Sequence, residues 1–244
     1  LYTVQSNVSG HISRLEKELG VVLIDRQRGG LTDEGLIVVD RARRVLHELD
    51  DISAEMASRG DEVHGDTRLG VLGTTARWLL PQLLQKLQLQ HPGVHVTVHE
   101  GNTTNLLPRL VAQHLDGAIV QLPVDDPEVS VEPLFAEDLL LLVHTRHPLS
   151  VHDEIQLADL AQVPLMLPPL GTTLRRVIDR AAAGSGIELV PQVEIDGVRL
   201  LASLAFEGFG AAIVPATSVP RWLKGDFKRI AVPELPRRVV GWVQ

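Results

Sequence analysis

The sequence predicts an α/β protein with a helical N-terminal segment followed by two α/β lobes. Strand-like and helix-like segments alternate between residues 67 and 121, and a second alternation follows between residues 165 and 215. Two amphipathic helices are expected before them, within residues 3–58. Because consecutive strand–helix–strand units favour parallel pairing, each alternation predicts a parallel sheet with right-handed crossovers.

Composition narrows the class of protein. The 244 residues fit one large or two ordinary domains, and 44% hydrophobic residues support large buried cores. The absence of cysteine excludes disulfides, thiolate metal sites and cysteine nucleophiles. No apolar run approaches the roughly 18 residues of a membrane span and no signal segment opens the chain, so a cytoplasmic protein with no membrane partner is expected.

The first expected helix begins at Thr3 or Val4 and ends before Gly20. Its apolar side chains recur at steps of four, three and four, so they share one face that is expected to be buried. A slender polar face of this kind fits the DNA major groove, where such side chains contact bases and phosphates. The apolar face comprises Val8, Ile12, Leu15 and Leu19, and the polar face Gln5, Ser6, Asn7, Ser9, His11, Arg14 and Lys17.

This segment resembles the winged helix-turn-helix of a LysR-type transcriptional regulator. The resemblance implies a recognition helix from Gln5 to Glu18 and a wing from Arg26 to Thr32, with a basic residue commonly found where Gly10 stands here. It also implies that the first helix and most of the second would precede Leu1. The matching residues are Gln5-Ser6-x-Val8-Ser9, Ile12, Leu15-Glu16, Glu18-Leu19-Gly20, Leu23, Asp25-Arg26 and Leu31-Thr32-x-x-Gly35.

Double-stranded DNA is therefore the expected partner of this segment. The alternative is an amphipathic helix packed on a core, with its polar face turned to water. The net charge does not distinguish these two interpretations, since residues 1–59 carry eight Lys and Arg against ten Asp and Glu. Binding to DNA would depend on a local basic cluster. The DNA-binding candidates are Gln5, Ser6, Asn7, Ser9, His11, Arg14, Arg26 and Arg28.

A long second helix is expected from Thr32 to Ser58, capped by Thr32 or Asp33. Its apolar residues repeat at intervals of seven, which predicts pairing with another helix; one-sided packing on its own domain is the alternative. The resemblance implies that it links two subunits of a dimer or tetramer, with a hinge at residues 60–66. The repeating columns, here called the apolar seam, are Val38, Val45 and Ile52, then Val39 and Leu46, then Ala42, Leu49 and Met56.

The remaining chain resembles the effector domain of LysR-type regulators, which shares its two-lobed architecture with periplasmic binding proteins. Its expected strands are 67–73, 94–98, 118–121, 130–135, 139–144, 165–167, 192–195, 211–215, 227–232 and 239–243, and its expected helices are 76–90, 103–115, 172–183 and 198–207. Matching motifs include Leu79-Leu80-Pro81, His91-Pro92-Gly93-Val94, His147-Pro148-Leu149 and Gly208-Phe209-Gly210. The family usually extends beyond Gln244.

The expected domains follow from this division. A partial winged helix-turn-helix covers residues 1–35, and the linker and dimerisation helix covers 36–59. Effector lobe I covers 66–145 and 226–244, and effector lobe II covers 146–225.

An effector cleft is predicted where these strands end. Leu-Gly-Thr-Thr occurs at residues 72–75 and 170–173, each time between a strand and a helix. Ligands of open α/β sheets lie at the carboxyl ends of strands, where helix N-termini offer free N–H groups. These groups suit a small polar or anionic effector, and Arg77 and Arg175 could add charge; plain N-capping is the alternative. The effector-binding candidates are Thr74, Thr75, Asn102, Thr103, Thr104, Gln121, Thr172 and Thr173.

Other chemistries lack a signal. His91, His95 and His99 are four apart but span a turn and a strand, so no metal site is expected. No nucleophile elbow, P-loop or dinucleotide fingerprint is present, so neither an enzyme nor a cofactor is expected. The preferred interpretation is a ligand-responsive DNA-binding transcriptional regulator. A periplasmic-type solute-binding protein is the alternative, and it has no use for a recognition helix followed by a heptad repeat.

Overall fold

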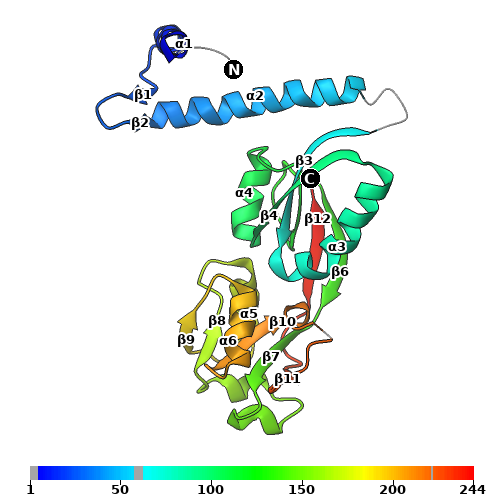
Figure 1. Ribbon diagram of the computed structural model, residues 1–244. Coiled ribbons are helices and arrows are strands. Elements are labelled where there is room, and N and C mark those ends of the chain that lie inside the picture. The colour runs from blue at the N-terminus through cyan, green and yellow to red at the C-terminus, as the bar shows by residue number, and fades with distance from the viewer. Residues whose placement is uncertain (1–4, 58–62, 221) are drawn as a thin grey trace. The chain divides into compact units, whose positions relative to one another are not determined.

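The computed structural model describes residues 5–57, 63–220 and 222–244 and divides the chain into two compact units, residues 1–65 and 66–244. The N-terminal unit has a short helix, a small hairpin and a long helix (Figure 1). These elements are α1 Gln5–Leu19, β1 Ile24–Asp25, β2 Gly30–Leu31 and α2 Asp33–Ala57.

Glu16 joins α1 to the hairpin. Its Oε1 accepts the backbone N–H groups of Leu23 at 2.8 Å and Ile24 at 3.3 Å, and these bonds lower the pKa of its carboxyl. Gly20 ends the helix in a left-handed conformation with φ of +71°. The carboxylate of Glu16 and the left-handed turn at Gly20 therefore fix the position of the hairpin relative to α1.

The last glycine of the family-like motif has a packing reason. A Cβ atom on Gly35 would lie 2.1 Å from the backbone oxygen of Leu23, which is far inside van der Waals contact. Gly35 also donates its N–H to Thr32 Oγ1 at 2.9 Å, so Thr32 caps α2 as expected. The wing and α2 meet at this point.

The expected burial of the apolar face of α1 is wrong for the described chain. Val8 and Leu19 are 43% and 49% exposed, whereas Leu23, beyond the helix, is buried. The physical reason is that one helix and a two-stranded hairpin provide too little surface to cover this face.

The apolar seam of α2 faces solvent along most of the described helix. Val45, Leu46, Leu49, Ile52 and Met56 are all about half exposed or more. Packing of this seam on its own domain, the alternative expectation, is therefore not seen for these five residues.

The C-terminal unit, residues 66–244, is called the effector unit here after the expectation from the sequence, and it contains two five-stranded sheets that occupy different parts of it (Figure 1). The first sheet has the order β4-β3-β5-β12-β6 and the second the order β11-β7-β10-β8-β9. The strands of the first are β3 His64–Leu72, β4 Gly93–Gly101, β5 Gly117–Gln121, β6 Val131–Glu137 and β12 Arg238–Val243. The strands of the second are β7 Leu139–His144, β8 Leu165–Leu167, β9 Pro191–Glu194, β10 Ala211–Pro215 and β11 Phe227–Ala231.

Four helices accompany these strands. They are α3 Gly73–Gln90, α4 Thr103–Val111, α5 Thr173–Gly184 and α6 Val198–Phe206, with short 3-10 helices at Pro148–Val151, Leu157–Leu160 and Ala216–Ser218. Four clusters of almost entirely aliphatic side chains form the cores, two for each sheet.

The sheets are mixed rather than purely parallel. β3 pairs with β5, and β8 pairs with both β9 and β10, in parallel. β12 runs antiparallel to β5 and β6, and β7 runs antiparallel to β10 and β11. The antiparallel strands are those by which the chain passes between the lobes.

The expected lobe boundaries need correction. The sequence predicts both β7 and β11 in lobe I, within residues 66–145 and 226–244. In the structure β7 pairs with β10 and β11 pairs with β7, so both strands belong to the second sheet. The chain changes lobe at Asp138 and again between Ala231 and Arg238. Two extended segments in direct succession give no sequence signal for which of them lies in which sheet.

Candidate functional site

The inter-lobe cleft is formed by two adjoining cavities in the effector unit. The outer cavity of about 410 Å³ and an inner one of about 30 Å³ share Leu72, Asn102, Asp196, Val198 and Arg238 as lining residues. Segments from both sheets contribute to each cavity. The cleft thus lies where the sequence predicts a ligand site, at the carboxyl ends of β3, β4, β5 and β8.

Six of the eight predicted effector residues line this cleft. Asn102, Thr103, Gln121, Thr172 and Thr173 surround the inner cavity, and Thr74 lines the outer one.

Thr75 and Thr104 do not line the cleft. Thr75 is fully buried behind Thr74, and Thr104 is exposed next to Thr103. Thr104 and Thr75 follow Thr103 and Thr74 inside α4 and α3, where successive side chains point about 100° apart, and this turn takes both of them away from the cleft. Both expectations are therefore corrected.

Asn102 and Thr172 cap helices and line the cleft at once. Asn102 Oδ1 accepts the N–H of Asn105 at 2.9 Å at the start of α4. Thr172 Oγ1 accepts the N–H of Arg175 at 3.3 Å and donates to Pro169 O at 2.8 Å. The capping alternative is correct for both residues, and it does not remove them from the cleft wall.

Gln121 supplies the free hydrogen-bonding group of the inner cavity. The residue is 2% exposed, and its backbone N–H donates to Thr103 Oγ1 at 2.9 Å. Its side-chain Nε2 has no hydrogen-bond partner within the described residues. An unsatisfied buried amide donor is costly, so this group favours a ligand with an acceptor.

A buried ion pair lies behind the outer cavity. Arg238 and Glu137 are 3% and 7% exposed, and Arg238 Nε donates to Glu137 Oε1 at 2.9 Å. Arg238 Nη2 also donates to Thr74 Oγ1 at 2.8 Å. Burial lowers the pKa of Arg238, while the carboxylate of Glu137 raises it.

Two polar contacts join the lobes at the cleft rim. Arg199 Nη2 of α6 donates to Glu100 Oε1 at 2.6 Å, and Asn102 Nδ2 donates to Asp196 Oδ1 at 2.5 Å. A Cβ on Gly73 would lie 2.3 Å from Glu100 Oε1, so a larger residue there would displace the Glu100 carboxylate from its present position.

The charges of the cleft do not form a simple anion site. The cations of Arg199 and Arg238 are matched by Glu100 and Glu137, and Asp196 adds a further carboxylate. The electrostatics favour a small polar ligand that both donates and accepts hydrogen bonds.

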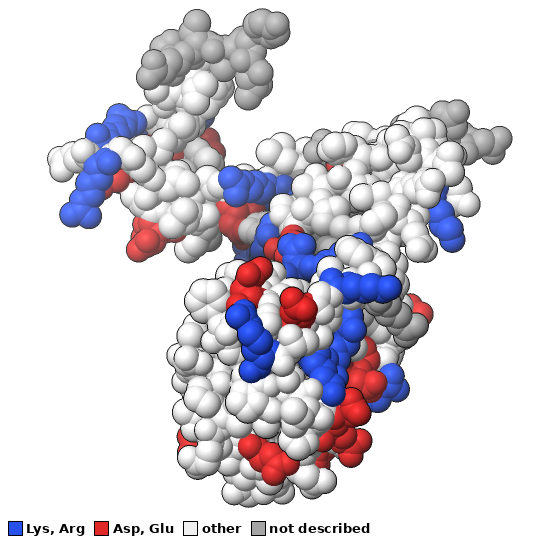
Figure 2. Space-filling model, turned by 60° about the horizontal axis from the view of Figure 1, so that its bottom comes forward, with Lys and Arg blue, Asp and Glu red and all other residues white. Residues whose placement is uncertain are grey.

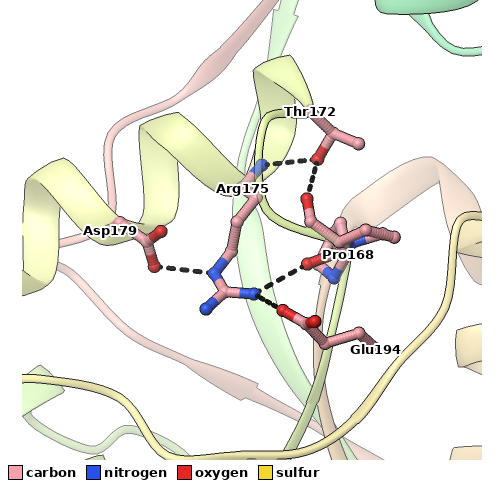
Figure 3. Close-up of polar contacts among 6 residues, drawn as sticks. Pro168, Thr172, Arg175, Asp179 and Glu194 are labelled. Carbon is pink, nitrogen blue, oxygen red and sulfur yellow. Dashed lines mark hydrogen bonds and ion pairs between the residues drawn. The ribbon is translucent and has the colours of Figure 1, made fainter.

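The two arginines expected to add charge lie elsewhere. Arg175 is 5% exposed and is held by Asp179 at 2.8 Å, by Glu194 and by the backbone oxygen of Pro168 (Figure 3). Burial alone would lower the pKa of Arg175, but these two carboxylates raise it. Arg77 lines a separate cavity. The turn of each helix directs both side chains away from the cleft.

Sequence reasoning missed the four charged residues of the cleft. Glu100 and Asp196 each stand just after or at the end of a strand and just before a helix, so the rule that found Asn102 would also have found them. Arg199 could have been predicted in the same way, because it lies in the first turn of α6. Arg238 has no such signal, because its position depends on the insertion of β12 between β5 and β6.

The predicted DNA-binding residues lie on α1 and the hairpin. Asn7, Ser9, His11 and Arg14 are exposed, whereas the side chains of Gln5 and Ser6 are outside the described residues. Arg26 Nη2 donates to Ser13 Oγ at 3.0 Å, so this guanidinium is held against the helix.

Arg28 is exposed in the wing turn. Its N–H and that of Gln27 are accepted by Asp25 Oδ1, at 3.0 and 2.9 Å. Basic and acidic side chains are interspersed over the effector unit on the face shown in Figure 2, without a continuous basic surface. The basic groups of α1 and the wing are therefore the local cluster that the sequence indicates.

The described parts of the chain show neither a metal site nor a membrane-spanning helix. Residues 5–57, 63–220 and 222–244 contain no group of three or more His, Asp or Glu arranged to hold a metal ion. No helix within the same ranges combines the length and the apolar character needed to cross a bilayer.

Comparison with known proteins relates both units to one family. Residues 60–243 match the LysR substrate binding domain, and residues 1–36 match the bacterial regulatory helix-turn-helix protein, lysR family. The DNA-binding transcriptional dual regulator OxyR of Escherichia coli is 31% identical over 245 residues, covering 98% of this chain and 80% of that protein.

Solved structures show the same fold. CbnR complexed with its target DNA is similar with a TM-score of 0.75 and 24% identity, covering 99% of this chain and 84% of that one. The effector-binding domain of QuiR in complex with shikimate is similar with a TM-score of 0.68 and 23% identity, covering 74% of this chain and 87% of that one.

Proposed function

Since the chain belongs to the LysR family of transcriptional regulators, we propose that it couples a small polar effector in the inter-lobe cleft to its contacts with DNA. As a member of this family it is a DNA-binding transcription regulator with an effector-binding domain. Its partners are DNA, a small-molecule effector and further copies of the chain. The match of the N-terminal segment to a helix-turn-helix excludes the solute-binding alternative.

The observation that carries the cleft proposal is Gln121. Gln121 lines the inner cavity together with Thr172 and Thr173 of the other lobe, and its buried Nε2 has no partner among the described residues. A ligand oxygen at this position would contact both lobes. It would favour one arrangement of the lobes by its difference in affinity for the two, typically about 1–3 kcal/mol.

Effector chemistry follows from the cleft wall. A carboxylate or other acceptor group suits Gln121 Nε2 and the N-terminus of α5, while a donor group suits the carboxylate of Asp196. Relatives of the chain are named hydrogen peroxide-inducible genes activators. The 244 residues contain no cysteine, so a response to peroxide by thiol oxidation cannot arise from them. We therefore propose a bound effector and no catalysis, in a regulator that acts in the cytoplasm, where its DNA is.

The cleft is tested by replacing Gln121 with leucine. A panel of small carboxylates, amino acids and inorganic anions is first screened by thermal shift. A ligand at a hundred times its dissociation constant adds about 2.7 kcal/mol to the free energy of unfolding of the domain that binds it. We expect Gln121→Leu to reduce the binding free energy of the best ligand by about 1 kcal/mol or more, because a buried hydrogen bond is lost.

Thr104→Val is the control, since it changes an exposed hydroxyl of α4 that lies outside the cleft, next to the cleft residue Thr103. Calorimetry should show the control binding as the parent does. Equal binding by Gln121→Leu and the parent would refute the cleft assignment.

DNA recognition is tested by two substitutions on the N-terminal unit. Arg28→Ala should weaken operator and random DNA alike and reduce the slope of binding against salt by about one, because one phosphate contact is lost. Gln5→Ala should weaken operator DNA alone, by about 1–3 kcal/mol for a bidentate base contact. Fluorescence anisotropy at several salt concentrations measures both. Equal losses on the two DNAs for Gln5→Ala would contradict base reading.

A further inference from the structure

A second cavity in the effector unit lies apart from the inter-lobe cleft. It has a volume of about 610 Å³, within the range of small-molecule sites, and none of its lining residues lines the cleft. It is bordered by the start of α3, by the crossover after β6 and by the segment that follows β10. The lining residues that matter here are Arg77, Trp78, Thr217 and Trp222.

Aromatic side chains form the walls of this cavity. Two of the three tryptophans of the chain line it, and Trp78 and Trp222 are 44% and 77% exposed. Two exposed rings that line one cavity can contact the same planar ligand. Trp78 is held by an edge-to-face contact with Phe135, with ring centroids 5.4 Å apart, so its free face is fixed in place.

The cavity also has an unneutralised cation. Arg77 Nη1 donates only to the backbone oxygen of Ser218, at 3.3 Å, and no described carboxylate pairs with it. The two acids at the cavity are already paired, because Asp138 is 3.0 Å from Arg237 and Glu137 is bound by Arg238.

A free hydroxyl lies on the same wall. The backbone N–H of Thr217 donates to Glu137 Oε2 at 2.8 Å, but its Oγ1 is buried without a hydrogen-bond partner in the described structure. A hydroxyl in this position can donate one hydrogen bond to an anionic oxygen, beside the stronger charge-assisted bond from the guanidinium.

From these features we infer that this cavity binds a small aromatic carboxylate, whose ring lies against Trp78 and Trp222 and whose carboxylate is held by Arg77 and Thr217. A planar anion satisfies the cation, the free hydroxyl and the exposed ring faces together, which neither an inorganic anion nor a neutral aromatic does. The site is distinct from the proposed effector cleft and does not depend on it.

Benzoate is the probe, measured by calorimetry on the full chain at constant protein concentration. Arg77→Gln should raise its dissociation constant about tenfold, as expected for the loss of a charge-assisted bond. Thr217→Val should weaken it less, and Gln121→Leu should leave it unchanged. Benzoate should also change the tryptophan fluorescence of the parent, and Trp222→Leu should diminish that change.

Two analogues separate the contributions of ring and charge. Cyclohexanecarboxylate retains the anion without the aromatic ring, and benzyl alcohol retains the ring without the anion; both should bind more weakly than benzoate. Equal binding by either analogue, no binding at millimolar benzoate, or an unchanged dissociation constant in Arg77→Gln would overturn the assignment. Loss of binding as the protein concentration rises would also overturn it, since a second copy of the chain would then cover the cavity.

Discussion

Replacing Glu137 with alanine is expected to destabilise the effector unit by about 3–5 kcal/mol, because it leaves the guanidinium of Arg238 buried without a counter-ion. The pair is nearly inaccessible to water, with Arg238 3% exposed. Glu137 Oε2 also accepts the N–H of Thr217, so the substitution removes a contact between the two lobes as well. All three tryptophans lie in the effector unit, so urea unfolding followed by tryptophan fluorescence reports on it.

A neighbouring pair provides the control. Asp138 and Arg237 form an ion pair at 3.0 Å, but their side chains are 75% and 62% exposed, so Asp138→Ala should cost about 1 kcal/mol or less. The double variant Glu137→Leu with Arg238→Met should be more stable than Glu137→Ala, because no unpaired charge remains. A loss for Glu137→Ala no larger than that for Asp138→Ala would contradict the assigned role of the pair.

The elements that the sequence predicts well are those specified locally. The end of α1 follows from Gly20, which adopts the left-handed conformation, and the start of α2 follows from Thr32, whose hydroxyl caps it. The position of the cleft follows from polar residues between strands and helices, such as Asn102 and Thr172. In each case the signal and the structure lie within a few residues of one another.

What could not be predicted depends on long-range pairing. The chain crosses between lobes at Asp138, inside what reads as continuous extended sequence, so the sheet membership of β7 cannot be deduced from local pattern. Arg238 reaches the cleft only because β12 inserts between β5 and β6. Arg77 and Arg175 look equivalent in sequence, yet one lines the second cavity and the other is held by Asp179.

Replacing Leu49 with glutamate is expected to separate the subunits while the effector unit stays folded. The apolar seam of α2 is exposed in the single chain, with Leu49 54% accessible, and we propose that it pairs with the same seam of a second copy. In such a symmetric pair two carboxylates would be buried without partners. This should cost about 3 kcal/mol or more and raise the dissociation constant of the dimer about a hundredfold or more.

The matched control is Ile37→Glu. Ile37 is 63% exposed and is turned about 120° from Leu49 around the helix axis, so it lies beside the seam and away from its centre. Sedimentation velocity should show loss of the oligomer for Leu49→Glu alone, while tryptophan fluorescence shows the effector unit intact in both variants. Binding to an operator with two half-sites should weaken with the loss of the oligomer, because two recognition helices are then no longer linked. An oligomer that survives Leu49→Glu would show that the copies are joined by another surface.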